Sequence, residues 1–212
     1  MIITIGGQKG GIGKSTIACE LVAYLERKKK SVVFIDADKQ ASSTDWVSYR
    51  YEMTDVKFKA VQLQGKMVVH EARKFAAEVD YVVIDAGGSD NVSQRAALSV
   101  SDAVLTLFNP SSLSIWTLET VEEVMEEALA LNHDLKCFSA LNRAWPAGKD
   151  NKQSALILKK SEVFTFIPKF VGNRKAFSDC MGSGLSVAEM KYPDKKAVEE
   201  INALFGSLLR RI

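Results

Sequence analysis

The sequence has few of the residues that build disulfide frameworks and metal cages. Its 212 residues include three cysteines and two histidines. The cysteines, Cys19, Cys137 and Cys180, form no C-x-x-C pair and are odd in number, which is typical of reduced thiols in a cytoplasmic protein. His70 and His133 are far apart in the sequence, so a Cys/His metal site has little support.

Long apolar runs and a strong excess of one charge are also missing. No apolar stretch reaches the roughly 18 residues that a membrane-spanning helix needs, and no signal peptide precedes the first apolar run. The net charge is +2 and hydrophobic residues make up 47% of the chain, which is ordinary for a globular protein. We therefore expect a cytoplasmic protein, in which any nucleic-acid site is a local basic patch.

The order of the apolar runs predicts an α/β protein. Short runs rich in valine and isoleucine alternate with longer stretches whose apolar residues recur at helical spacing. Strands are predicted at 2–5, 31–38, 81–88, 104–110, 136–143 and 164–169, with a half-buried edge strand at 56–63. Helices are predicted at 15–29, 41–51, 66–78, 91–100, 114–132, 151–160, 173–181 and 194–211. This alternation implies a mostly parallel, twisted sheet with helices on both faces, and we expect one domain spanning residues 1–212.

The segment IGGQKGGIGKST at residues 5–16 carries the clearest functional signal. It lies between an apolar run and a stretch of helical spacing, which is the strand, glycine-rich turn and helix that a phosphate-binding loop requires. Gly10, Gly11 and Gly13 free the backbone to point consecutive N–H groups at phosphate oxygens. The helix that follows adds its positive dipole end to the same anion.

The residues that follow these glycines predict the rest of the nucleotide site. We expect Lys14 to reach the β- and γ-phosphates, and Ser15 to hold Mg²⁺ through its hydroxyl. The predicted nucleotide-binding run extends from Gly10 to Thr16 and includes Ile12.

Three carboxylates follow predicted strands. Asp36 and Asp38 end one strand and Asp85 ends another. Because ligands bind outside the carboxyl ends of parallel strands, all three are expected to converge on the glycine-rich loop. Asp85 follows the apolar run YVVI, as the second acidic signature of a phosphate-binding-loop protein does. It is predicted to bind Mg²⁺ through water or through Ser15.

A second lysine, Lys9, lies inside the loop, which therefore reads KGGIGKST. This loop resembles that of the deviant-P-loop ATPases, the family of ParA partition proteins, MinD and the nitrogenase iron protein. In that family the extra lysine crosses a nucleotide-sandwich dimer and touches the partner's phosphates. The resemblance implies this role for Lys9, and ATP and Mg²⁺ as cofactors.

The segment DADKQ at residues 36–40 resembles the family's D-x-D-P-Q. This match puts Asp36 near the metal and gives Asp38 the task of orienting or activating the attacking water. The catalytic residues so implied are Lys9, Lys14 and Asp38. Lys39 replaces the usual proline, which makes the turn less rigid, and a turn or helix-capping aspartate remains the alternative for Asp38.

The carboxyl-terminal third of the chain offers candidate base and DNA contacts. By the same resemblance, Asn142 at the end of a predicted strand and Pro168 in IPKFV contact adenine. The basic residues of KFVGNRK at 169–175, extended by Arg210 and Arg211, would help an ATP-bound dimer to hold DNA through its phosphates. A solvated basic surface is the alternative.

The resemblance covers essentially the whole chain and is nearest to the small, ParF-like class of ParA proteins. It implies an ATP-dependent homodimer with weak ATPase activity that binds non-specific DNA and associates with the nucleoid in the cytoplasm. A ParB-like, centromere-binding adaptor protein would stimulate hydrolysis, and the system would partition a plasmid or chromosome.

Two other functions stay open. One is a MinD-like positioning ATPase, whose basic carboxyl-terminal helix grips a membrane, and the other is a positioning factor for a cargo other than DNA. The final stretch VEEINALFGSLLRRI is amphipathic, but Ile201, Leu204 and Leu208 also have the spacing of an ordinary core-facing helix. Trp116 and Phe108 are interpreted as packing residues.

Overall fold

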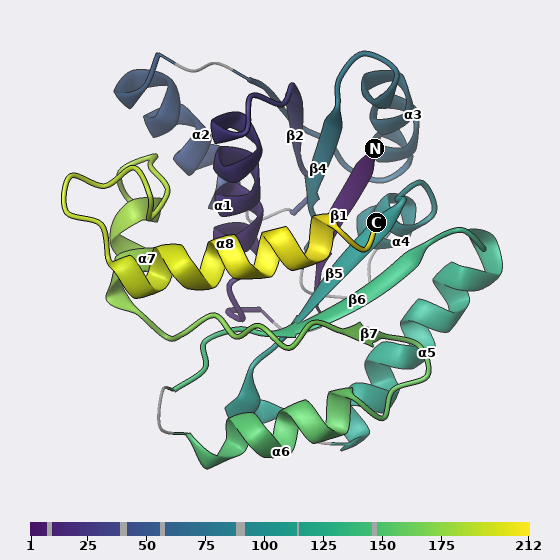
Figure 1. Ribbon diagram of the computed structural model, residues 1–212. Coiled ribbons are helices and arrows are strands. Elements are labelled where there is room, and N and C mark those ends of the chain that lie inside the picture. Colours follow the sequence, from purple (N-terminus) through teal and green to yellow (C-terminus); the bar gives the residue numbers. More distant parts are fainter. Residues whose placement is uncertain (8–9, 39–41, 56–57, 88–91, 114, 146–147) are drawn as a thin grey trace.

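The protein is built on one seven-stranded sheet (Figure 1). The computed structural model describes residues 1–7, 10–38, 42–55, 58–87, 92–113, 115–145 and 148–212. The strand order is β3-β2-β4-β1-β5-β6-β7 and every pair of neighbours is parallel. The predicted parallel α/β architecture is confirmed. The strands are β1 (Ile2–Gly6), β2 (Val32–Asp36), β3 (Lys59–Gln62), β4 (Tyr81–Asp85), β5 (Ala103–Phe108), β6 (Lys136–Leu141) and β7 (Thr165–Phe166).

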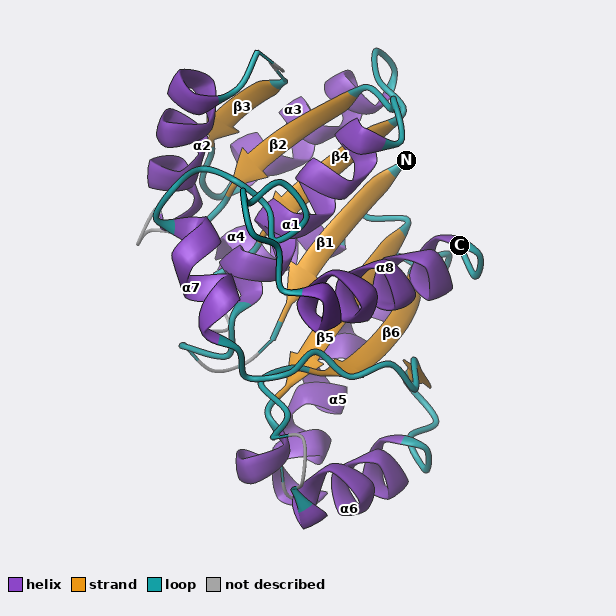
Figure 2. Cartoon of the chain, turned by 60° about the vertical axis from the view of Figure 1, so that its left-hand side comes forward, coloured by secondary structure: helices purple, strands orange, loops and turns teal. Residues whose placement is uncertain are grey.

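Helices cover both faces of this sheet (Figure 2). On one face α1, α2, α7 and α8 share a core with inward residues of the strands. On the other face α3 and α4 pack on the β2 and β4 side, and α5 and α6 pack on the β5 and β6 side. Their bounds are α1 (Lys14–Arg27), α2 (Ser42–Met53), α3 (Lys66–Ala76), α4 (Val92–Leu98), α5 (Ile115–Leu131), α6 (Lys149–Leu158), α7 (Lys175–Met181) and α8 (Lys195–Leu209), with a 3₁₀ turn η1 (Pro110–Ser112) before α5.

The strand burial follows from this layering. All residues of β1, β2 and β5 are buried, as expected of parallel strands covered on both sides. The predicted edge strand is confirmed, because β3 lies at the end of the sheet with half-buried and exposed residues. The carboxyl ends of β1, β2 and β4 therefore meet at one edge, where the glycine-rich loop and the strand-end carboxylates follow.

The carboxyl-terminal helix packs as a core-facing helix. Ile201, Leu204, Phe205 and Leu208 are each at most 1% exposed, and the Phe205 ring meets the Tyr24 ring edge-on at 5.4 Å. Figure 1 shows α8 lying across the face of the sheet that α1 also covers. The apolar side of this amphipathic helix is already buried, which favours the core alternative over membrane binding.

Two packing expectations need correction. Trp116 is 81% exposed, because the inward positions of α5 are taken by Leu118 and later residues of the same stripe. Tyr49 is exposed whereas Trp46 on the same helix is buried, so the two do not share a side as predicted. Phe108 is buried against Phe164 as expected.

A buried arginine joins three segments. Arg50 of α2 is fully buried and pairs with Glu26 of α1 at 2.8 Å and with Glu189 at 2.9 Å. It also donates to the Gly184 carbonyl at 3.1 Å. Beside it, the Trp46 indole donates to the Leu185 carbonyl. A paired buried arginine with satisfied donors holds α2 against α1 and the 184–189 segment.

Gly184 gives a stability prediction at this junction. Its φ is +67° and an added Cβ would lie 2.3 Å from the Arg50 backbone nitrogen, so Gly184→Ala should destabilise folding by about 3 kcal/mol or more. Chemical unfolding monitored by circular dichroism measures the loss. Gly182→Ala is the matched control, because its Cβ would meet nothing closer than 3.9 Å. Equal stability of the two variants would contradict the prediction.

Of the helices in the described part of the chain, none is both long enough and apolar enough to cross a membrane.

Candidate functional site

The glycine-rich loop connects β1 to α1. Gly11 and Gly13 adopt φ of 75° and 89°, a left-handed conformation that favours glycine. A Cβ at Gly13 would fall 2.6 Å from the Asn142 amide nitrogen, whereas Cβ atoms at Gly10 and Gly11 would meet nothing within 4 Å. Close packing against Asn142 therefore explains why residue 13 is a glycine. The backbone at Gly10 and Gly11 is open to an approaching anion, as a phosphate-binding loop requires.

Lys14 begins α1 beside this open backbone. The residue is only 6% exposed. Burial lowers the pKa of the Lys14 amine, and the carboxylates of Asp85 and Asp38 oppose that shift. A buried cation next to open loop amides is arranged to receive a phosphate group.

Two carboxylates lie side by side at the ends of β2 and β4. Asp36 and Asp85 are register partners in the sheet and are 4% and 0% exposed. The first residues of α2 hold them in place, with Thr44 Oγ1 donating to Asp36 Oδ2 at 2.9 Å and Ser43 Oγ donating to Asp85 Oδ2 at 2.9 Å. The predicted convergence of these two strand-end carboxylates is observed.

Asp85 is the more deeply buried of the pair. Burial raises the pKa of Asp85 to about 7; hydrogen bonds from the Ser15 and Ser43 hydroxyls oppose the shift, and the charge of Asp36 adds to it. Asp85 Oδ1 is buried with no hydrogen-bond partner among the residues described. A carboxylate oxygen without a partner, close to a serine hydroxyl, suits a cation or the water shell of a cation.

The protein supplies only part of a metal coordination sphere. In the described ranges, no group of three or more His, Cys, Asp or Glu residues could hold a metal ion. Mg²⁺ often keeps several waters and uses one or two carboxylates together with substrate phosphates. Ser15, Asp36 and Asp85 fit that pattern, in which the phosphates complete the site.

Asp38 follows this pair. Its backbone N–H donates to Asp36 Oδ1 at 3.1 Å, so the turn after β2 is tied to the first carboxylate. The side chain of Asp38 is half-buried and near enough to influence the Lys14 amine. The structure thus brings the carboxylate of Asp38 close enough to the Lys14 amine for their charges to interact.

Asn142 lies against the loop from the other side. Its side chain is buried and donates to the Ile12 carbonyl at 2.7 Å. The structure therefore gives Asn142 a bracing contact that the sequence did not indicate. Its contact with adenine stays a prediction.

Pro168 is exposed and borders a cavity of about 450 Å³. Backbone pairing of Ala144 with Val171 and Gly172 brings the segment after Asn142 alongside the segment after Pro168. The two predicted base contacts therefore come from neighbouring segments.

The expected basic patch is only partly available. Arg174 is held by Glu200, with Nη2 to Oε1 at 2.6 Å and Nε to Oε2 at 3.0 Å, so its charge is already compensated. Lys169, Lys175 and the arginines at 210 and 211 are exposed. Any DNA contact would depend on these residues and not on Arg174.

Sequence reasoning missed Ser43 and Thr44, although both hydroxyls hold the strand-end carboxylates. The hydroxyl-rich run SST at residues 42–44, one residue after DADKQ and at the start of a helix, was the available signal. Lys9 and Lys39 lie outside the described residues, so the role of Lys9 and the effect of Lys39 on the turn stay predictions.

A buried glutamate of α1 predicts a pH effect on stability. Glu20 of α1 is 1% exposed and accepts from the Val187 N–H at 2.8 Å and from the Cys180 thiol at 3.3 Å. Burial raises the pKa of Glu20 from 4.5 to about 7, and these hydrogen bonds oppose the shift. The folded protein therefore keeps a proton that the unfolded chain loses, so stability falls as pH rises between about 4.5 and 7.

The Glu20→Gln variant should lack this loss. Relative to wild type, its unfolding free energy should rise by about 2–3 kcal/mol from pH 5 to pH 8, measured by urea titration without nucleotide or Mg²⁺. Glu199→Gln, at an exposed position of α8, is the control and should follow wild type. Parallel stability curves for wild type and Glu20→Gln would refute the prediction.

Comparison with known proteins agrees with this geometry. The chain matches the CobQ/CobB/MinD/ParA nucleotide binding domain over residues 3–187. It is 24% identical to the maintenance of carboxysome distribution protein A of Halothiobacillus neapolitanus, over 98% of this chain and 95% of that protein.

Two solved structures share the fold. A putative plasmid partition protein of Borrelia burgdorferi bound to AMPPNP superposes with a TM-score of 0.73 at 23% identity, covering 100% of this chain and 99% of that one. The MinD cell division protein of Aquifex aeolicus superposes with a TM-score of 0.70 at 20% identity, covering 97% of each chain.

Proposed function

Because the chain belongs to the CobQ/CobB/MinD/ParA nucleotide-binding family, we propose that it is a Mg²⁺-dependent ATPase of the ParA type. In this proposal two subunits enclose ATP, the dimer holds DNA non-specifically, and hydrolysis releases it. An adaptor protein bound to a centromere-like site stimulates turnover. The observation that supports the proposal is the buried Asp85 beside the loop residues Lys14 and Ser15, with one oxygen that has no partner among the described residues.

The protein's own groups would act mainly by positioning. The open amides of Gly10 and Gly11 and the amine of Lys14 would bind the phosphates and neutralise their charge. Ser15, Asp36 and Asp85 would hold Mg²⁺, which supplies further charge neutralisation. Asp38 would orient the attacking water, since its turn is fixed on Asp36.

The dimer in this proposal depends on Lys9. Its amine would reach the phosphates bound by the opposite subunit, so that the two subunits associate only around ATP. This assignment rests on the two-lysine loop, KGGIGKST.

DNA retention tests the partition function. In an electrophoretic mobility assay at low salt, the ATP-loaded protein should shift plasmid DNA and the ADP-loaded protein should not. Lys169→Ala/Lys175→Ala should weaken the shift, because both lysines are exposed in the predicted patch. Lys152→Ala/Lys159→Ala is the control, because Lys152 is an exposed residue of α6 and Lys159 is an exposed residue directly after that helix. ATP-loaded protein that ignores plasmid DNA would exclude the DNA-binding function.

A positioning factor for another cargo is the second candidate. The relative from Halothiobacillus neapolitanus, which is named for carboxysome distribution, aligns with 98% of this chain, and this full-length match favours the candidate. A MinD-like membrane function has less support, because the apolar side of α8 is buried. Co-sedimentation of the intact, ATP-loaded chain with anionic vesicles separates the membrane function from the other two.

A further inference from the structure

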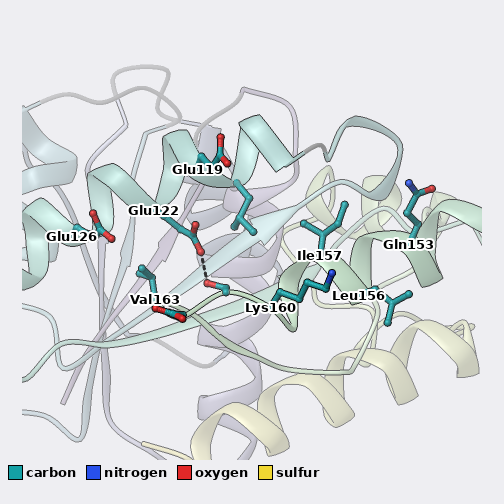
Figure 3. Close-up of a pocket in the computed structure, with 11 residues that line it drawn as sticks. Glu119, Glu122, Glu126, Gln153, Leu156, Ile157, Lys160 and Val163 are labelled. Carbon is teal, nitrogen blue, oxygen red and sulfur yellow. Dashed lines mark hydrogen bonds between the residues drawn. The ribbon is translucent and has the colours of Figure 1, made fainter.

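A groove lies between α5 and α6, on the far side of the sheet from α1 and α8 (Figure 3). Its volume is about 470 Å³. Apolar side chains from both helices and the following turn contribute to its lining: Leu118, Leu156, Ile157 and Val163. Leu156 is 61% exposed, so part of this apolar lining faces solvent.

The α5 side of the groove is strongly acidic. Glu119, Glu122 and Glu126 line it from one helix, as Figure 3 shows, and Glu162 adds a fourth carboxylate. On the opposite side Lys160 is the lining cation. The charged lining residues therefore carry a net charge of −3, from four carboxylates and one amine.

The carboxylates differ in what they already contact. Glu122 accepts a hydrogen bond from the Ser161 hydroxyl, which also accepts from the Phe164 N–H, so it helps to shape the turn. Within the part of the chain that the structure describes, neither Glu119 nor Glu126 has a hydrogen-bond or ion-pair partner. These two glutamates are available to an incoming cation.

The spacing favours a helical occupant. Glu119, Glu122 and Glu126 stand at positions i, i+3 and i+7 of α5, along about two turns or roughly 10 Å of helix. A second helix lying along the groove can present lysines or arginines at the same spacing while its leucine-type residues enter the apolar lining.

We propose that the α5–α6 groove docks a cationic amphipathic helix of a partner protein. The partner's apolar stripe packs on Leu156 and Ile157, and its basic flank pairs with Glu119 and Glu126. The inference rests on the proposed function in one respect, because it names this helix as the part of the adaptor that recognises the ATPase. None of the described residues of the glycine-rich loop lines the groove, so docking need not compete with nucleotide.

A synthetic peptide tests the groove directly. The probe is a helix-forming peptide of about 18 residues with leucines at i, i+3, i+4 and i+7 and lysines beside them. The control peptide has the same sequence with glutamates in place of the lysines. All three native cysteines are buried, so a fluorophore on Gln153→Cys reports selectively from the groove lining. Addition of the lysine peptide should change the fluorescence of this label until the signal saturates, and addition of the glutamate peptide should leave the signal unchanged.

Charge reversal supplies the matched variants. Glu119→Lys/Glu126→Lys should weaken binding of the lysine peptide about tenfold or more. Glu123→Lys/Glu78→Lys makes the same change of charge at exposed positions outside the groove and should bind like wild type. Equal weakening by both pairs, or no weakening by the first pair, would overturn the proposal.

The ATPase assay keeps this test separate from that of the proposed function. Glu119→Lys/Glu126→Lys should retain wild-type basal ATP hydrolysis, because the groove contains none of the residues assigned to the nucleotide. Peptide binding without any ATPase activity in wild type would refute the proposed function and leave the groove in place. ATPase activity with no peptide binding to the groove would refute the docking site alone.

Discussion

Lys14→Ala is expected to lower kcat/KM for ATP by about 10²–10³-fold, because it removes the buried cation that is proposed to bind the phosphates. The loss should appear first in binding, measured by fluorescent-nucleotide titration or calorimetry. Folding should survive, since burial of Lys14 is itself unfavourable and lowers the pKa of its amine.

Two controls sharpen that result. Lys14→Arg keeps the charge but puts a larger, planar guanidinium in place of a compact ammonium at a buried position, so it should also bind ATP poorly. Lys28→Ala, at an exposed position just past the same helix, should leave binding unchanged. Normal ATP affinity in Lys14→Ala would remove this lysine from the site.

Asp38→Ala is expected to separate binding from hydrolysis. The loop amides, Lys14 and the buried pair of Asp36 and Asp85 all remain, so ATP affinity should stay within a few-fold of wild type. The turnover rate should fall about 10²-fold or more, since only the group that is proposed to position the attacking water is lost. Single-turnover hydrolysis with radiolabelled ATP measures the effect.

Asp45→Ala is the matched control for this prediction. Asp45 is an exposed aspartate in the first turn of α2, so its loss should leave both affinity and turnover near wild type. Unchanged turnover in Asp38→Ala would leave Asp38 with the turn-capping role that the sequence also allowed.

The parts of the site that were predictable depend on local spacing. A strand, a glycine-rich turn and a helix lie within the first 27 residues, so one continuous segment of sequence is enough to predict a phosphate-binding loop. The carboxylates of Asp36 and Asp85 were also predictable, because parallel strands bring their carboxyl ends to one edge regardless of how the helices pack.

The remainder depends on contacts between distant segments. Asn142 meets Ile12 across 130 residues, and Cys180 meets Glu20 across 160, which no local pattern encodes. Nothing in the sequence around Arg50 indicates its burial, which is possible because two glutamates from separate segments pair with it. The prediction for Trp116 was wrong in the opposite direction, because a residue expected to be buried is exposed. Aromatic character predicts packing but does not show which face of a helix turns inward.

The association of two subunits around ATP, with Lys9 donated across the interface, is the central claim. Its most direct measurement is the mass of Asp38→Ala in saturating Mg·ATP by light scattering, beside that of Lys9→Ala/Asp38→Ala. We predict a dimer for the first variant, and for the second a monomer that still binds ATP. A monomeric Asp38→Ala with ATP bound, or a dimer that forms equally well without Lys9, would contradict the claim.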